Sequence, residues 1–119
     1  MRYSNIFSRL WNASKYSLCG LIYALKHEQA FRYEAAVLLI LSVVIVILDL
    51  PFKSSSVIII AWLFVMCIEL INSSVEKAFN LIDEHYRPEI KAGKDMLSAS
   101  VFIAIICNVI LWLNLLFLL

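Results

Sequence analysis

The sequence predicts an all-α integral membrane protein with one surface helix followed by three membrane-spanning helices. Hydrophobic residues make up 63% of its 119 residues, and the mean hydropathy is +0.89. Soluble domains are usually about 45–50% apolar. Three long apolar runs account for the difference, and an amphipathic segment precedes them. A chain of this size forms one domain, so we assign residues 1–119 to a single unit.

The charge excludes a protein that binds nucleic acid, because the net charge is only +1 and such proteins carry a strong basic surface. The three cysteines are far apart in the sequence and lack the spacing of metal ligands. They therefore indicate neither a disulfide framework nor a zinc site.

The surface helix is predicted over residues 4–27. Phe7, Leu10, Trp11 and Leu18 recur at helical spacing, while the basic residues fall largely elsewhere. This pattern is typical of an amphipathic helix that lies at the membrane interface with its apolar side toward lipid.

The three spans follow, because about 20 apolar residues cross the hydrocarbon core as a helix. Pro51 and the serines at 54–56 predict a short turn after the first span. Pro88 and Gly93 are expected to break the polar connection that precedes the third span. The predicted spans are residues 33–50, 57–79 and 97–118.

The basic residues predict the orientation of the chain in the membrane. Nine of the ten Lys and Arg residues lie before the first span or around the 80–95 connection, and only Lys53 lies on the other side. Basic loops stay in the cytoplasm. The N-terminus and the 80–95 connection are thus expected to be cytoplasmic and the C-terminus to lie on the opposite side.

A polar stripe interrupts the second span. Glu69, Asn72, Ser73 and Glu76 are three, four and seven residues apart, which places them on one face of a helix. A carboxylate near the bilayer interior costs at least ~2.5 kcal/mol and usually marks a functional site. The stripe is therefore the first candidate for chemistry.

Two further clusters are expected at the same interface, at residues 28–34 and 94–98. Glu69 is a candidate general base. Glu28 and Glu76 are candidates to hold Mg²⁺, which takes one or two carboxylates together with substrate phosphates. Lys94 would offset phosphate charge. A base, a metal site and a cation are the components of phosphoryl transfer.

Structural roles are open for some of these residues. Glu28 and Arg32 have the spacing of a helix ion pair, and Asp95 has the position of a helix cap. A different function, an ion or proton pathway, also places carboxylates in a membrane. Only Asn108 and Asn114 continue the polar groups along the third span, and a relay needs partners at every depth.

Four segments carry a resemblance to a known family: residues 16–21, 28–34, 69–76 and 94–99. With these elements the chain closely resembles the prokaryotic integral-membrane diacylglycerol kinase family, which also contains undecaprenol kinases. The resemblance implies a homotrimer with shared sites in a bacterial inner membrane, with the C-terminus in the periplasm. It also implies transfer of the γ-phosphate of MgATP to the hydroxyl of diacylglycerol, giving phosphatidic acid. Undecaprenol remains the alternative acceptor.

The resemblance also implies roles for individual residues. Glu69 would be the general base with Asn72 beside it, and Glu28 and Glu76 would hold Mg²⁺. The implied nucleotide contacts are Arg9, Tyr16, Glu28, Glu76, His85, Tyr86, Arg87, Lys94 and Asp95. The implied contacts with the lipid substrate are Ala13, Ser14, Ser17, Ala30, Phe31, Arg32, Glu34, Glu69, Ser98 and Trp112.

The sequence departs from the family pattern at a few positions. Asn80 stands where the family usually carries Asp, and Ser14 stands where it usually carries Ala. Lys77-Ala-Phe replaces a run of small and β-branched residues after Glu76. None of these departures removes a residue to which we assign chemistry.

Overall fold

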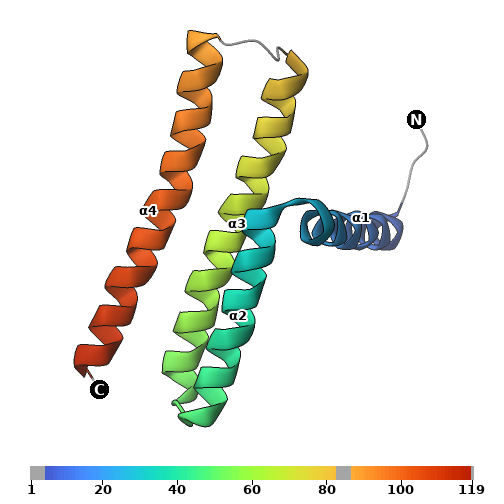
Figure 1. Ribbon diagram of the computed structural model, residues 1–119. Coiled ribbons are helices and arrows are strands. Elements are labelled where there is room, and N and C mark those ends of the chain that lie inside the picture. Colours follow the sequence, from blue (N-terminus) through green and yellow to red (C-terminus); the bar gives the residue numbers. More distant parts are fainter. Residues whose placement is uncertain (1–4, 83–86, 119) are drawn as a thin grey trace.

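A computed structural model describes residues 5–82 and 87–118 (Figure 1), and within them the chain forms four α-helices. Three of these helices are long and apolar enough to cross a membrane. The predicted class, an all-α protein with an N-terminal helix and three spans, is therefore confirmed. The helices are α1 (Ile6–His27), α2 (Gln29–Ile47), α3 (Phe52–Ile82) and α4 (Pro88–Leu118).

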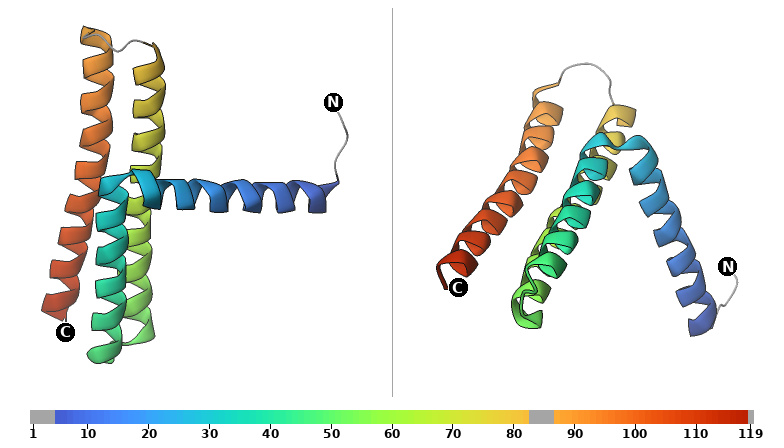
Figure 2. Two further views of the ribbon diagram at one scale, coloured as in Figure 1. Left: turned by 45° about the vertical axis from the view of Figure 1, so that its right-hand side comes forward. Right: turned by 60° about the horizontal axis from the view of Figure 1, so that its bottom comes forward.

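The three apolar helices α2, α3 and α4 run side by side, and α1 runs across their direction (Figure 2). The central helix is α3, which packs against both α2 and α4, whereas α1 contacts α2. The apolar residues of α1 are mostly exposed, and Phe7 and Trp11 are 78% and 72% accessible. This arrangement fits a helix that rests on a membrane surface beside three spans.

The corner between α1 and α2 is stabilised by hydrogen bonds from a side chain to the backbone. The extended backbone of Glu28 (φ −109°, ψ 109°) interrupts the helix. The last carbonyl groups of a helix lack partners within it, and here Nη1 of Arg32 donates to the carbonyl oxygens of Lys26 (2.9 Å) and Leu25 (3.3 Å). At the other end of α1, the Asn5 side chain accepts a hydrogen bond from the amide of Ser8 (2.7 Å).

The turn between α2 and α3 is shorter than predicted. It includes Asp49, whose φ of 51° is left-handed, and α3 begins directly after Pro51. The prediction that the serines at 54–56 belong to the turn was wrong. The hydroxyl groups of Ser55 and Ser56 donate to the carbonyl oxygens of Leu50 (3.3 Å) and Phe52 (2.8 Å), which lets serine lie inside a helix.

The helix α4 begins earlier than predicted, with Pro88 at its first position, where proline is favoured. Gly93 lies inside α4 and does not break it. A Cβ atom at Gly93 would stand 2.5 Å from Cζ of Phe79, so glycine admits the Phe79 ring of α3. Asp95 is not a helix cap, because it lies well inside α4, where its Oδ2 accepts from Nζ of Lys91 at 2.7 Å.

The buried core is small and lies around α3. Nε1 of Trp62 donates to the carbonyl oxygen of Glu34 (2.8 Å), which joins α3 to α2. Nδ2 of Asn108 donates to the carbonyl oxygen of Ala61 (3.1 Å), which joins α4 to α3. Most other large apolar side chains are exposed, as expected where lipid covers them. The buried apolar residues are Ala24, Phe31, Trp62, Val65, Met66 and Ala104.

We expect Trp62→Phe to lower the free energy of unfolding by about 1 kcal/mol, because phenylalanine cannot make the buried hydrogen bond to Glu34. The measurement is SDS-induced unfolding of detergent-solubilised protein followed by circular dichroism. Trp11→Phe, on the exposed face of α1, is the matched control. An equal loss in both variants would contradict the assignment.

Candidate active site

The Glu69 side chain is buried and held by two neighbours on the same helix. It is 6% exposed. Its Oε2 atom accepts hydrogen bonds from Nδ2 of Asn72 (3.3 Å) and from Oγ of Ser73 (3.1 Å). The donors follow Glu69 by three and four residues, which places them next to it on one face of the helix. A carboxylate fixed in this way has a defined direction in which to accept a proton.

A second carboxyl group comes from α2. Glu34 is 8% exposed, and its carboxyl group lies near that of Glu69. Oε1 of Glu34 and Oδ1 of Asn72 are buried and have no hydrogen-bond partner among the described residues. Buried polar atoms in native proteins nearly always have partners, so these two atoms are candidates to contact a bound group.

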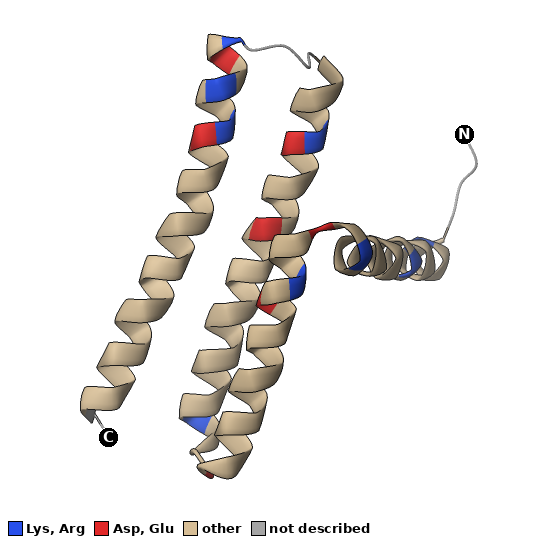
Figure 3. Ribbon diagram, in the orientation of Figure 1, with Lys and Arg blue, Asp and Glu red and all other residues tan. Residues whose placement is uncertain are grey.

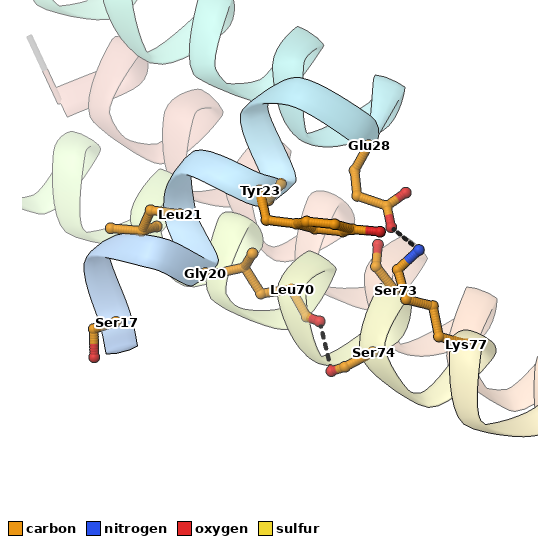
Figure 4. Close-up of a pocket in the computed structure, with 10 residues that line it drawn as sticks. Ser17, Gly20, Leu21, Tyr23, Glu28, Leu70, Ser73, Ser74 and Lys77 are labelled. Atoms are coloured by element: carbon orange, nitrogen blue, oxygen red, sulfur yellow. Dashed lines mark hydrogen bonds and ion pairs between the residues drawn. The ribbon is translucent and has the colours of Figure 1, made fainter. Parts of the chain in front are cut away.

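A groove of about 510 Å³ opens between α1 and α3 (Figure 4). At one end of it, Nζ of Lys77 lies 3.2 Å from Oε1 of Glu28. The same ammonium group lies 5.3 Å from the centre of the Tyr23 ring, within the range of a cation–π contact. The groove is lined by Ser17, Gly20, Leu21, Tyr23, Ala24, Glu28, Leu70, Ser73, Ser74 and Lys77.

The residues predicted to hold Mg²⁺ offer oxygen atoms, the type of ligand that this ion takes. Among the residues that the structure describes, no three His, Cys, Asp or Glu side chains gather at one point. Mg²⁺ needs only one or two carboxylates when substrate phosphates and water complete its coordination. Glu28 lines the groove, Glu76 is half-buried on α3, and the partnerless Oδ1 of Asn72 is a suitable hard oxygen.

The predicted nucleotide contacts are spread over α1, the corner at Glu28, α3 and α4. Nζ of Lys94 donates to Oδ1 of Asn80 (2.8 Å), which links α4 to the end of α3. Arg9 and Tyr16 are exposed on α1, and Arg87 directly precedes α4. His85 and Tyr86 lie outside the described residues.

The predicted lipid contacts divide into exposed and buried groups. Phe31 belongs to the buried core, and Arg32 stabilises the end of α1 and does not pair with Glu28. The Trp112 ring centre lies 6.1 Å from that of Trp62. The exposed members on α1, α2 and α4 are Ala13, Ser14, Ser17, Ala30, Arg32 and Ser98.

A family model identifies the family of the chain. The model for prokaryotic diacylglycerol kinase matches residues 15–116. The chain belongs to the prokaryotic diacylglycerol kinase family. The resemblance inferred from the four sequence segments is thereby confirmed. Membership makes the chain a kinase acting on a lipid alcohol and, with three apolar helices long enough to cross a membrane, a bacterial membrane protein.

Curated relatives agree with this membership. A diacylglycerol kinase of Escherichia coli strain K12 is 37% identical over 106 residues, which cover 89% of this chain and 87% of the relative. A diacylglycerol kinase of Haemophilus influenzae is 38% identical over 110 residues, 92% of this chain and 93% of the relative. A diacylglycerol kinase of Pseudomonas aeruginosa is 32% identical over 108 residues, 91% and 88% of the two chains.

Lys77 and Tyr23, the cation and the aromatic ring at the groove, were absent from the predicted site. Lys77 follows Glu69 by eight residues, so helical spacing alone would have placed it on the same stripe. Tyr23 gave no such signal, because its contact with Lys77 depends on how α1 turns back toward α3. Both residues now belong to the candidate site of this family member.

We expect Ser73→Ala to lower kcat of the kinase by about tenfold while KM for the lipid changes little, because the variant removes one of the two hydrogen bonds that orient Glu69. Steady-state kinetics in mixed micelles measure both constants. Ser56→Ala removes a hydroxyl near the far end of α3, where it donates to the carbonyl oxygen of Phe52, and should behave as the parent. A loss of kcat in Ser56→Ala as large as that in Ser73→Ala would reject the positioning role.

Proposed function

We propose that the chain is a diacylglycerol kinase that transfers the γ-phosphate of MgATP to the free hydroxyl of diacylglycerol and forms phosphatidic acid. The observation that carries the proposal is the buried Glu69 carboxylate, held by Asn72 and Ser73 next to the groove that Ser73 also lines. The relatives described above are diacylglycerol kinases, which supports this choice of acceptor over undecaprenol.

The acceptor chemistry follows from the position of Glu69. The groove has apolar walls of Leu21, Ala24 and Leu70, which suit the acyl chains of a lipid. A lipid hydroxyl beside Ser73, which lines the groove and contacts Glu69, gives its proton to the Glu69 carboxylate. The alcohol oxygen then bonds to the γ-phosphorus, the bond from that phosphorus to the β–γ bridging oxygen breaks, and ADP leaves.

The nucleotide side of the reaction would use Glu28 and Glu76. Bound Mg²⁺ supplies neutralisation of the developing charge on the phosphate oxygens. The carboxylates would hold the ion, and Lys94 would contact the phosphates from α4. Because the base is buried, water is kept away from it, and this favours transfer to the lipid over hydrolysis of ATP.

The charges of the spanning helices support a cytoplasmic site. Lys and Arg gather on α1 and toward the ends of α3 and α4 that flank residues 83–87 (Figure 3), whereas Lys53 lies at the opposite end of α3. In a positive-inside orientation, the N-terminus and the site face the cytoplasm, where ATP is available, and the C-terminus lies in the periplasm. We further propose a homotrimer, in which neighbouring copies complete the exposed groove.

The proposal is tested with γ-labelled ATP and purified protein in mixed micelles that contain equimolar diacylglycerol and undecaprenol. We expect labelled phosphatidic acid as the main product, and we expect chelation of Mg²⁺ to abolish it because the phosphate charge is then uncompensated. A preference for undecaprenol by about an order of magnitude, or about 1.4 kcal/mol, would overturn the choice of acceptor. If vesicles that contain the protein conduct ions without ATP and no lipid is phosphorylated, the proposed kinase function would be overturned.

We expect Glu69→Gln to lower kcat by at least about 10²-fold, the range of a lost general base, while size-exclusion chromatography shows the parent's oligomer. Glutamine keeps the shape and one acceptor oxygen but cannot take the hydroxyl proton. Gel filtration and the labelled-ATP assay measure the two effects. Turnover within about tenfold of the parent would mean that a different group accepts the proton.

A further inference from the structure

The contact between Lys77 and Glu28 joins two parts of the candidate site that are far apart in sequence. Lys77 comes from α3 and Glu28 from the corner between α1 and α2, and their side chains meet at 3.2 Å at the polar end of the groove (Figure 4). The Lys77 side chain is 50% exposed and the Glu28 side chain 24% exposed. The ammonium group is therefore placed where an incoming phosphate can reach it.

The position of Lys77 relative to the candidate base is equally specific. Glu69, Ser73 and Lys77 are four residues apart in turn, so they follow one another along one side of α3. Ser73 donates to Glu69 and lines the groove together with Lys77. The cation thus lies beside a carboxylate proposed to hold the metal, about two helical turns along α3 from the carboxylate proposed to accept the hydroxyl proton.

We propose that Lys77 is an exchangeable cation of the phosphoryl-transfer site. It pairs with Glu28 while the nucleotide is absent, and it moves to an oxygen of the phosphate chain when MgATP arrives. This inference rests on the proposed kinase function and adds a residue that the predicted site did not include.

The exchange has a physical basis on both sides. An exposed ion pair contributes only about 0.2–1 kcal/mol, so Lys77 leaves Glu28 at small cost. A lysine is a compact point charge on a flexible stem with three rotatable donors, which suits a group that changes partner. The Tyr23 ring, whose centre lies 5.3 Å from Nζ, keeps the ammonium near the groove. When Lys77 leaves, the Glu28 carboxylate can bind the metal ion.

The test uses Lys77→Met, which keeps the aliphatic stem and removes the charge. With a fluorescent non-hydrolysable ATP analogue and Mg²⁺, we expect its dissociation constant to rise by about tenfold or more, the effect of losing one charged hydrogen bond. Lys77→Arg should stay within about threefold of the parent because it keeps the charge. The matched control is Lys53→Met, on the same helix but at its opposite end, and it should bind as the parent does.

A second readout needs neither nucleotide nor turnover. Titration of Mn²⁺ alone, followed by electron paramagnetic resonance, reports on the carboxylates directly. Lys77→Met should bind Mn²⁺ more tightly than the parent, because Glu28 no longer has a competing cation. Unchanged Mn²⁺ affinity, unchanged affinity for the nucleotide analogue, or an equal loss in Lys53→Met would each overturn the role of Lys77. A parent protein that phosphorylates no lipid alcohol would count against the proposed function instead.

Discussion

The candidate site depends on one constraint, which is that a carboxylate at the membrane boundary must be held by partners within the protein. Glu69 satisfies this constraint through Asn72 and Ser73, with Glu34 of α2 beside it. Burial of such a group without partners is costly. The packing of α2 against α3, fixed by the hydrogen bond from Trp62 to the Glu34 carbonyl, therefore serves the fold and the site together.

Much of the fold could be predicted because its signals are local. The length of each apolar run predicts a span, and the spacing of Glu69, Asn72 and Ser73 predicts one polar face. The helix starts were less predictable. Ser55 and Ser56 lie inside α3, where their hydroxyl groups donate to preceding carbonyl oxygens, and close contact with Phe79 explains why Gly93 lies within α4. Both effects depend on neighbours that a propensity rule does not include.

The site was predictable where its residues share a helix and less so where helices meet. The Glu69 stripe lies on α3 alone, so helical spacing was sufficient to find it. The pair of Glu28 and Lys77 and the contact of Lys77 with Tyr23 depend on the corner between α1 and α2. That corner is set by the extended backbone of Glu28 and by the hydrogen bonds of Arg32, which no spacing rule predicts. Family membership supports the overall function, whereas individual residue roles rest on this local chemistry.

The central claim is that α3 brings a fixed carboxylate to the place where a lipid hydroxyl meets a magnesium nucleotide. The most direct measurement is an experimental structure of the protein with Mg²⁺, a non-hydrolysable ATP analogue and diacylglycerol. The account predicts the lipid hydroxyl within hydrogen-bond distance of Glu69 and the phosphate chain beside Glu28. A structure in which Glu69 faces only acyl chains, with nucleotide and lipid hydroxyl on separate faces of the protein, would contradict it.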